Sequence, residues 1–182
     1  MDDLGLPRRV TLRDGTVADI RFLSRRESVE SLRDFINALV EERAQIIYDR
    51  KVGMKAEREW IRARLGSRRE GTGYLLVAKV GGAIAGTSGA DRGRFKEREN
   101  VSLGLAIARR YRGIGLGEAL LRINIEVARR SLKPRNIFLS VLSTNRRAVS
   151  LYRKVGFRKF ALFPRWVDHF GKRVDHVFMK LD

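Results

Sequence analysis

The chain has 182 residues, of which 43% are hydrophobic, enough to bury the core of one ordinary domain. Its 39 lysines and arginines against 21 aspartates and glutamates give a formal charge of +18, which should attract phosphates, nucleic acid or acidic proteins. The absence of cysteine excludes disulfides, thiolate metal sites and a cysteine nucleophile, and the lack of any run of about 18 apolar residues leads us to expect a cytoplasmic protein without a membrane span.

The beginning of the sequence predicts a β-hairpin followed by a helix. Residues 10–23 read as two short strands joined by an Asp-Gly dipeptide, which tolerates the positive φ angles of a tight turn. Apolar residues then recur at helical spacing until about Glu42. Ser24 and Glu27 have the form of a capping box, so we expect the helix to start there.

The next segment predicts a second helix and two paired strands. Residues 55–65 have a helical pattern that Gly66 is placed to end, and the residues between the two helices read as a loop. Strand-like runs at 73–80 and 83–89 are separated by Gly81-Gly82, a turn signal that makes them antiparallel neighbours. A polar, exposed segment follows them.

Strands and helices alternate in the second half of the chain. Residues 101–108 predict a third strand of this group, and a long apolar helix is expected over residues 116–132, where Lys133-Pro134 breaks it. Residues 137–142 form a short apolar run that is typical of a strand buried on both faces. A helix is predicted at 146–155.

The end of the chain predicts a hairpin. Its two strands, at about 157–167 and 174–181, flank a turn that contains Gly171. No repeat, low-complexity tract or long linker interrupts the order of elements. We therefore expect residues 1–182 to form one domain.

A glycine-rich turn, Arg112-Gly-Ile-Gly-Leu-Gly117, joins the third strand of the group to the long helix. Such a turn presents unpaired backbone N–H groups at the positive end of the helix dipole, where a pyrophosphate is stabilised. A P-loop is excluded because no Gly-Lys-Ser or Gly-Lys-Thr follows. A dinucleotide fold would place its fingerprint near the start of an alternating strand and helix chain, whereas here several strands come first.

Two motifs carry a resemblance to a known family. Arg112-x-x-Gly115-x-Gly117 matches the Gln/Arg-x-x-Gly-x-Gly/Ala signature of the GNAT N-acetyltransferases. Residues 145–157 (NRRAVSLYRKVGF) match the second motif of that family, with Asn, Tyr and Gly-Phe at the same intervals. The chain thus resembles a GNAT N-acetyltransferase over nearly its whole length.

The resemblance implies an α/β (α+β) fold with a mixed, mostly antiparallel central sheet flanked by helices. The fourth and fifth strands would splay apart to admit the pantetheine of acetyl-CoA, the acyl donor. The reaction implied is transfer of the acetyl group to an amine by direct attack on the thioester. No metal is expected, and the two histidines, His169 and His176, lack the serine elbow of a hydrolase triad.

The resemblance also implies a set of cofactor-binding residues. Backbone groups of residues 105–107 would pair with the pantetheine amides, residues 113–118 would receive the pyrophosphate, and Asn145 would contact the pantetheine arm. For Asn145 the alternative is a simple helix cap beside Thr144. The implied cofactor-binding residues are Leu105, Ala106, Ile107, Arg112, Gly113, Ile114, Gly115, Leu116, Gly117, Glu118 and Asn145.

Tyr152 and Glu99 are the candidate catalytic residues. The resemblance places Tyr152 where its hydroxyl can protonate the departing CoA sulfur, although its periodicity alone favours a core aromatic residue. Many relatives place a glutamate on the strand before the glycine turn, but Val101 and Ser102 stand there in this chain. Glu99, just upstream, could act as the base through a water held by Ser102, or could be a solvated charge.

The acceptor amine is expected between the loop at 44–53 and the hairpin tip at 165–172, where Asp49 or Asp168 could pair with an ammonium group. A protein lysine, a protein N-terminus or a small amino compound would each fit, whereas the charge of +18 disfavours a polyamine. The alternative from another class is a non-catalytic basic module that binds CoA or nucleic acid, and for nucleic acid the net charge is the only indication. A homodimer through the last strands stays open.

Overall fold

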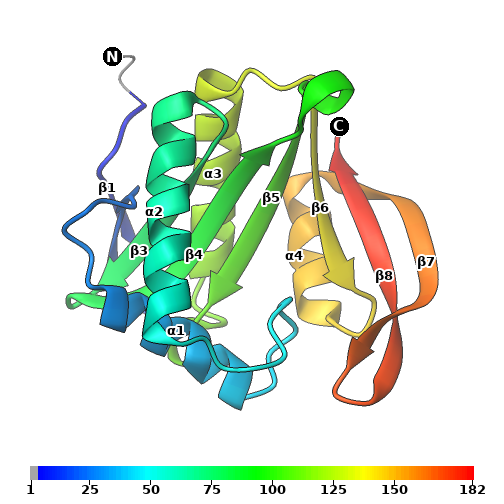
Figure 1. The fold of residues 1–182 in the computed structure, drawn as a ribbon, viewed down its shortest axis with the longest axis horizontal. Coiled ribbons are helices and arrows are strands. Elements are labelled where there is room, and N and C mark those ends of the chain that lie inside the picture. Colours follow the sequence, from blue (N-terminus) through cyan, green and yellow to red (C-terminus); the bar gives the residue numbers. More distant parts are fainter. Residues whose placement is uncertain (1–3) are drawn as a thin grey trace.

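The computed structural model describes residues 4–182, which form eight strands and four α-helices around one sheet (Figure 1). The strands are β1 (Arg8–Thr11), β2 (Val17–Phe22), β3 (Gly73–Val80), β4 (Ala83–Arg92), β5 (Asn100–Ile107), β6 (Asn136–Leu142), β7 (Phe157–His169) and β8 (Lys172–Leu181). The helices are α1 (Val29–Glu41), α2 (Met54–Glu70), α3 (Leu116–Ser131) and α4 (Arg146–Val155), with short 3-10 turns η1 (Phe95–Glu97) and η2 (Arg109–Tyr111).

The strands are ordered β1-β2-β3-β4-β5-β6-β8-β7 across the sheet. Six of the seven neighbouring pairs are antiparallel, and only β5 and β6 run parallel. This parallel pair is connected through α3, as a parallel connection requires a crossover element. The mixed, mostly antiparallel sheet implied by the sequence resemblance is confirmed.

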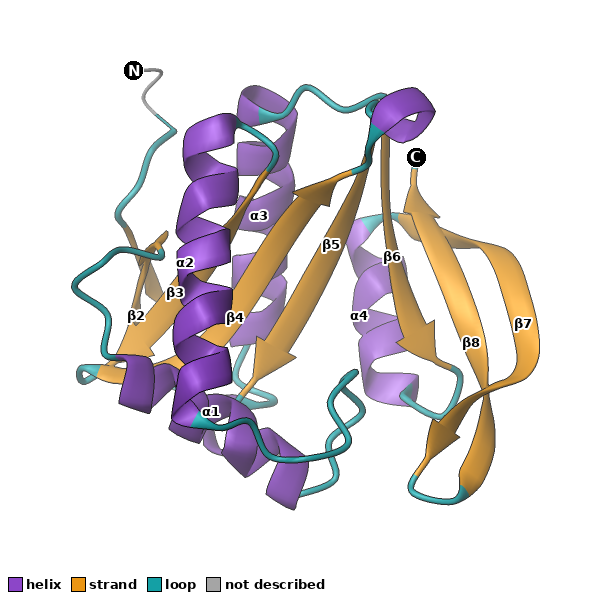
Figure 2. Ribbon diagram, viewed as in Figure 1, coloured by secondary structure: helices purple, strands orange, loops and turns teal. Residues whose placement is uncertain are grey.

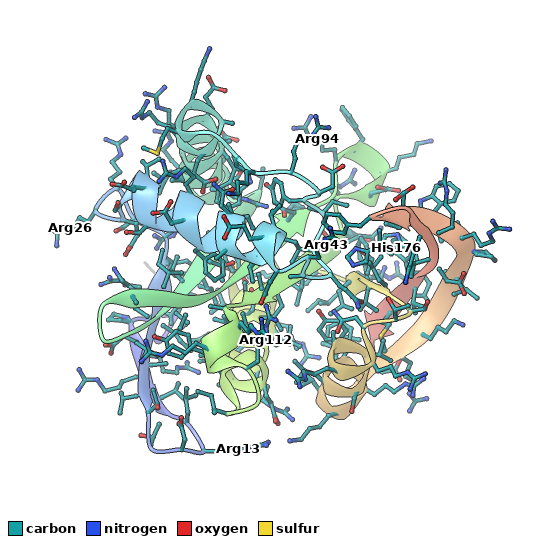
Figure 3. All side chains as sticks on the ribbon, turned by 90° about the horizontal axis from the view of Figure 1, so that it is seen from below. Arg13, Arg26, Arg43, Arg94, Arg112 and His176 are labelled. Carbon is teal, nitrogen blue, oxygen red and sulfur yellow. The ribbon has the colours of Figure 1, made fainter. Side chains whose placement is uncertain are left out.

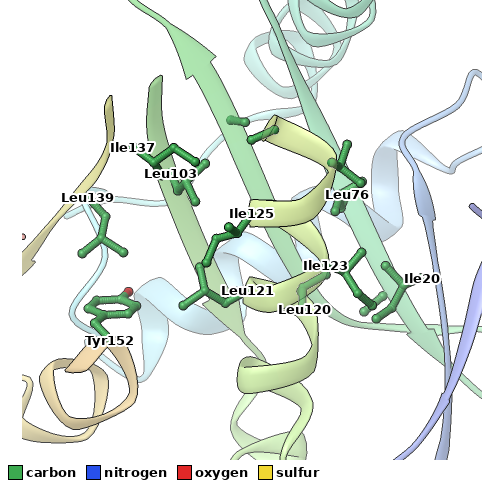
Figure 4. Packing of buried hydrophobic residues seen from close by; sticks show 14 of the residues in the cluster. Ile20, Leu76, Leu103, Leu120, Leu121, Ile123, Ile125, Ile137, Leu139 and Tyr152 are labelled. Atoms are coloured by element: carbon green, nitrogen blue, oxygen red, sulfur yellow. The ribbon is translucent and has the colours of Figure 1, made fainter. Parts of the chain in front are cut away.

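Helices cover both faces of the sheet (Figure 2). On one face, α1 and α2 pack through Leu32, Leu39 and Ile61 onto Leu75 and Val77 of β3. On the other face, α3 and α4 bury the larger cluster of apolar side chains, part of which is seen in Figure 4. We call these the α1/α2 face and the α3/α4 face below.

The first helix starts later than the sequence suggested. The capping box at Ser24 and Glu27 is wrong, because Ser28 caps α1 and its hydroxyl accepts the N–H of Ser31 at 3.2 Å. Glu27 is drawn toward the sheet instead, since its buried carboxylate pairs with Lys79 of β3 at 3.0 Å. Ser24 accepts the Arg26 N–H in the preceding turn.

The second helix is longer than predicted. Gly66 lies inside α2, and the left-handed residue that ends the helix is Gly71, with φ 68°. A glycine in a helix interior costs about 1 kcal/mol relative to alanine, and contacts of the last turn offset this cost. One of these contacts places the Arg68 guanidinium 3.7 Å from the centre of the Phe22 ring.

β6 is also different from its prediction as a strand buried on both faces. Its side chains alternate, with Ile137 and Leu139 buried and Ser140 exposed. The buried side chains face α3 and α4. Ser140 points to the opposite face of the sheet, and neither α1 nor α2 covers that face at β6. The pattern of a short apolar run cannot show that the helices on one face of the sheet end before they reach this strand.

β5 and β6 separate partway along their length. They pair only from Asn100 and Asn136 to Ser102 and Phe138, and then diverge toward the lower edge of the sheet in Figure 1. These are the strands that the family resemblance counts as fourth and fifth, because the opening hairpin contributes two strands here. The implied splay is therefore present.

The larger core cluster can be tested with two leucines. Leu121 of α3 is fully buried (Figure 4), whereas Leu162 on the edge strand β7 is 40% exposed. We expect Leu121→Ala to lower the free energy of unfolding by about 2–5 kcal/mol, and Leu162→Ala by less than about 1 kcal/mol. Urea titration of both variants measures this, and equal losses would contradict the assigned core.

Candidate active site

The glycine-rich turn has the geometry of an anion site. Gly113 and Gly115 adopt φ 87° and 96°, and Gly115 is the N-terminal cap of α3. The first intrahelical bond runs from the Ala119 N–H to the Gly115 carbonyl at 3.1 Å. The amides of residues 116–118 therefore have no intrahelical acceptor, and they lie at the positive end of the helix dipole. This arrangement can hold a phosphate group.

The turn is held in place from two sides. The Arg13 N–H in the opening hairpin donates to the Ile114 carbonyl at 3.0 Å. Arg112 donates from Nε to the Ile107 carbonyl at 2.9 Å, and its Nη2 forms an ion pair with Glu42 at the end of α1. Arg112 thus braces the turn through its side chain, and direct contact with a cofactor stays a prediction.

Three cations gather beside the start of α3. The carboxylate of Glu118 binds Lys154 of α4 at 2.6 Å, Arg122 at 3.2 Å and Arg13 at 3.5 Å. The hydrogen bond from Lys154 is the main reason that the pKa of Glu118 lies below its usual value. The sequence did not indicate this cluster, because its members come from the opening hairpin, α3 and α4.

Gly117 lies where the turn meets β5 and α4. A Cβ atom at this position would stand 3.4 Å from Leu151, 3.6 Å from Ile107 and 3.8 Å from Leu105, which is ordinary van der Waals contact. The close packing brings the start of α3 against the end of β5. The predicted turn residues and the predicted strand residues are therefore adjacent in the structure.

The open edge of β5 can take an extended ligand. β5 pairs with β4 along its length, from Val101 to Ile107, but with β6 only as far as Ser102. Residues 103–107 therefore have backbone N–H and C=O groups on one edge without a strand partner, as at the edge of a sheet. Leu105, Ala106 and Ile107 lie on this stretch, as expected.

Asn145 is the helix cap of α4. Its Oδ1 accepts the Ala148 N–H at 3.2 Å, so the simpler of the two interpretations is confirmed as one role of this residue. The cap uses only the oxygen of the amide, and Nδ2 is left as a donor. A contact between Nδ2 and the pantetheine arm stays a prediction.

Tyr152 of α4 is a buried phenol on the α3/α4 face of the sheet. Its side chain is 6% exposed and lies near Phe157, with 6.1 Å between ring centres, and Figure 4 shows it beside Leu139 of β6. Burial raises the pKa of Tyr152 to about 12, so the phenol is protonated at neutral pH. The Tyr152 hydroxyl has no hydrogen-bond partner among the described residues. Among residues 4–182, the only fully buried side-chain polar atom without a partner is Asn124 Oδ1, so the Tyr152 hydroxyl must be in contact with solvent.

Glu99 lies away from the open part of the splay. Its side chain is exposed just before β5, and its carbonyl accepts the N–H groups of Arg135 at 2.8 Å and Asn136 at 3.1 Å. This is the end at which β5 and β6 are joined. The structure therefore does not bring Glu99 to the part of the cleft beside the glycine turn, and its role as a base stays a prediction.

The α1–α2 loop and the last hairpin meet at the cleft mouth. Arg43 lies over the ring of Phe170 at 5.2 Å, and Gln45 accepts a hydrogen bond from Thr144 at 3.1 Å. Figure 3 looks at this end of the molecule, with Arg112 between α1 and α3. The expected acceptor side is thus bounded by the two predicted segments. Asp168 is already used within the hairpin, where it accepts the Gly171 N–H at 2.7 Å.

Aromatic side chains line the hairpin side of the mouth. Phe178 of β8 packs edge-on against Phe163 of β7, which contacts Trp166, and the exposed fraction of Trp166 is 65%. His176 stacks beside Phe178, and burial lowers the pKa of His176 so that its imidazole is mainly neutral at pH 7. The sequence did not indicate this cluster, because a register shift between Phe163 and Val167 determines which side chains meet.

A separate groove of about 720 Å³ lies between α3, the end of α4 and the end of β8. It does not include the glycine turn or the open edge of β5. Its basic lining residues are Arg122, Arg129, Arg130, Arg153 and Arg158. Within residues 4–182, no helix is long and apolar enough to cross a bilayer, and no three acidic or histidine side chains gather as a metal site.

Comparison with known proteins identifies the class. The model of the acetyltransferase (GNAT) family matches residues 34–157, so the chain belongs to this family. It is 33% identical over 94 residues to the N-alpha-acetyltransferase RimI of Mycobacterium tuberculosis, covering 51% of this chain and 57% of RimI. It is 29% identical over 105 residues to the L-amino acid N-acetyltransferase AaaT of Escherichia coli, covering 57% of this chain and 65% of AaaT. Both matches span less than two thirds of the relative.

Solved structures extend the likeness to most of the chain. The putative acetyltransferase yncA from Salmonella typhimurium, solved with its cofactor acetyl-CoA, is 26% identical with a TM-score of 0.79, and 91% of this chain and 93% of that chain are covered. A GNAT-family acetyltransferase from Streptococcus pneumoniae has the same identity and TM-score, with 90% and 97% covered. The GNAT resemblance drawn from the two motifs is confirmed.

The brace between Arg112 and Glu42 can be measured with a double-mutant cycle. Each side chain is largely buried, with exposed fractions of 28% and 14%. We expect Arg112→Ala and Glu42→Ala each to lower the free energy of unfolding by about 1–3 kcal/mol, because each leaves its partner unpaired. The double variant should lose less than the sum, with a coupling of about 0.5–3 kcal/mol in urea titrations. Additive losses would show that the two side chains do not depend on each other.

Proposed function

We propose that this chain is an acetyl-CoA-dependent N-acetyltransferase, in which an acceptor amine attacks the thioester directly. One observation carries the proposal: β5 loses its partner β6 after Ser102, and its open edge leads straight to the glycine turn and the start of α3. An extended thioester with a pyrophosphate at one end fits this continuous path. The structure of yncA with acetyl-CoA supports the same donor.

The residues of the turn fit a pyrophosphate. No atom lies within 4 Å of the position that a Cβ would take on Gly113, so a ligand can approach the backbone closely there. The free amides at 116–118 would bind the phosphate oxygens, and Arg13 and Lys154 supply positive charge nearby. Backbone groups of residues 105–107 would pair with the pantetheine amides.

Tyr152 is proposed to be the general acid. As the bond between the acetyl carbon and sulfur breaks, the phenol can donate its proton to the sulfur and so prevent the build-up of a thiolate. Its pKa of about 12 keeps the proton in place until that moment. Asn145 at the start of α4 would hold the pantetheine arm through Nδ2.

The curated relatives favour an α-amino group in the acceptor. RimI is named as an N-alpha-acetyltransferase and AaaT as an L-amino acid N-acetyltransferase, and both names describe an amine on an α-carbon. The exposed aromatic side chains of the mouth, among them Trp166 and Phe163, would contact an apolar side chain next to that amine. Amino acids and peptide N-termini are therefore the first acceptors to test, with lysine side chains as the comparison.

An acetyl-transfer screen decides between an enzyme and a non-catalytic binding module. Thiol release from acetyl-CoA is followed with amino acids, peptides of varied first residue and peptides with a blocked N-terminus and one free lysine. We expect transfer to at least one free α-amine, identified by mass spectrometry of the product. Binding of acetyl-CoA without transfer to any of these amines would favour the binding module.

The role of Tyr152 is tested by Tyr152→Phe. We expect kcat to fall at least about tenfold while the dissociation constant of acetyl-CoA changes little, because the phenol would act only as the bond to sulfur breaks. Tyr74→Phe is the matched control, since Tyr74 is also a buried phenol but donates to the Asn124 carbonyl inside the core. That variant should lose about 1 kcal/mol of stability and keep its kcat. Unchanged turnover of Tyr152→Phe would defeat the assignment.

A further inference from the structure

α2 carries a buried carboxylate that has no counter-charge. Glu57, in the first turn of α2, is 5% exposed, yet no cation of residues 4–182 lies within ion-pair distance of it. A carboxylate in such a place normally pairs with a cation or accepts several hydrogen bonds. An unpaired one costs stability, which makes Glu57 a candidate for a functional role.

Glu57 lies on the α1/α2 face of the sheet. Glu57 and Arg64 stand two helical turns apart on one side of α2, and Ile61 between them packs into the cluster on the α1/α2 face. Arg64 binds both carboxylate oxygens of Asp91 on β4, one of them at 2.9 Å. Asp91 lies directly opposite Ser102 on β5, so both side chains are on the α1/α2 face.

The level of Glu57 along β5 follows from this contact. α2 rises alongside β4 in Figure 1, and Glu57 precedes Arg64 by about 10 Å along the helix axis. Arg64 marks the level of Ser102, where the pairing of β5 with β6 ends. Glu57 therefore lies toward Ala106, which packs against the same cluster as Ile61 and belongs to the open edge of β5.

Tyr48 in the α1–α2 loop lies within electrostatic range of Glu57. Burial raises the pKa of Tyr48, the negative charge of Glu57 raises it further, and the positive charge of Arg64 lowers it. Tyr48 therefore interacts electrostatically with both side chains. It is the titratable group that faces Glu57 from another element, whereas burial is the cause that raises the pKa of Glu57 itself.

The other carboxylates around the mouth already have partners. They are engaged by a guanidinium or by a backbone N–H, so they are less free to accept a proton from a substrate. These pairs are Glu42 with Arg112, Asp91 with Arg64, Asp49 with Arg50, Asp168 with the Gly171 N–H and Asp175 with the Arg165 N–H. Val101, one of the positions where relatives carry a glutamate, is fully buried in the core.

We propose that Glu57 is the general base that takes the proton from the acceptor's ammonium group. This inference rests on the proposed acetyl transfer. It assigns the proton acceptor to α2, in place of Glu99 at the joined end of β5 and β6.

The protons and electron pairs balance in the following way. The carboxylate of Glu57 takes one proton from the ammonium nitrogen, whose lone pair then forms the bond to the thioester carbon. The bond from that carbon to sulfur breaks, its electron pair goes to sulfur, and the sulfur receives the proton of Tyr152. The nitrogen gives up a second proton, which restores the Tyr152 phenol, and the proton on Glu57 passes to water. The raised pKa of Glu57 makes it a stronger base than a solvated carboxylate.

Glu57→Gln tests the inference, with Glu59→Gln as the matched control on the exposed side of the same helix. With the amine found in the acceptor screen, we expect kcat/KM at pH 7 to fall by about 100-fold or more in Glu57→Gln, and the affinity for acetyl-CoA to be unchanged. The loss should shrink as the pH rises toward the pKa of the amine, because more of the acceptor then arrives without its extra proton. Glu59→Gln should follow the wild type at every pH.

Each other outcome has a definite meaning. If the wild-type chain transfers acetyl groups and Glu57→Gln has the same pH profile, the inference about Glu57 is overturned and the proposed function stands. A loss of equal size at every pH also overturns it, because a structural role would give that result. If the wild-type chain transfers the acetyl group to no amine, the proposed function fails and the role of Glu57 fails with it.

Thermal unfolding separates a lost base from a lost fold. A raised pKa means that the folded chain binds a proton at Glu57 more tightly than the unfolded chain, so this residue favours folding at low pH and stops doing so as the pH rises through its pKa. At pH 7 the midpoint of Glu57→Gln should therefore equal or exceed that of the wild type. The difference should shrink as the pH falls toward about 4, where the wild-type carboxyl is protonated. A lower midpoint at pH 7 would show that Glu57 is paired, which overturns the inference.

Discussion

The arrangement of the site depends on where one ladder of backbone hydrogen bonds stops. β5 and β6 are joined by a few residues at one end, and after Ser102 and Phe138 the two strands no longer pair. Backbone N–H and C=O groups need partners, so an open edge inside a sheet can persist only where solvent or a ligand supplies them. Because α3 starts where β5 ends, this edge leads directly to the free amides of the helix. The constraint that opens the sheet also places the anion site at the end of the opening.

The two halves of the sheet are held at a fixed separation by contacts on both sides of the opening. β6 pairs with β8 from Phe138 to Leu142, so the arm that carries the aromatic side chains remains a hydrogen-bonded sheet beyond the point where β5 and β6 part. At the mouth, the α1–α2 loop reaches this arm through Arg43 and Gln45. Asn37 fastens the other end of that loop by exchanging two hydrogen bonds with Val52, at 3.0 and 2.7 Å. The loop that carries Tyr48 is therefore tied to both α1 and the arm.

Local signals in the sequence predicted the glycine turn and helix α4 well, because both depend on residues close together in the chain. Asn145 caps α4, and Gly156 ends it with φ 107°, at the predicted bounds. The predicted start of α1 and end of α2 were wrong because the local sequence allows more than one choice. Ser24 and Ser28 can both cap a helix, and Gly66 can lie inside one. The brace of Arg112 on Glu42 joins segments that lie far apart in the chain, and no spacing within the sequence encodes it.

Electrostatics on two length scales act in opposite directions on Glu57. The formal charge of +18 creates a positive field that favours the ionised form of any carboxylate and would lower its pKa. That field is screened within about 8–10 Å by salt, whereas the loss of water around a buried side chain acts at contact distance. Burial raises the pKa of Glu57, which is opposite in direction to the effect of the field. The same field repels an incoming ammonium group at long range, and a desolvated carboxylate at the end of the approach would favour the cation only once it has entered. Under the proposed function, a site of this kind would favour a single amine carried on a neutral or anionic molecule over a polyamine.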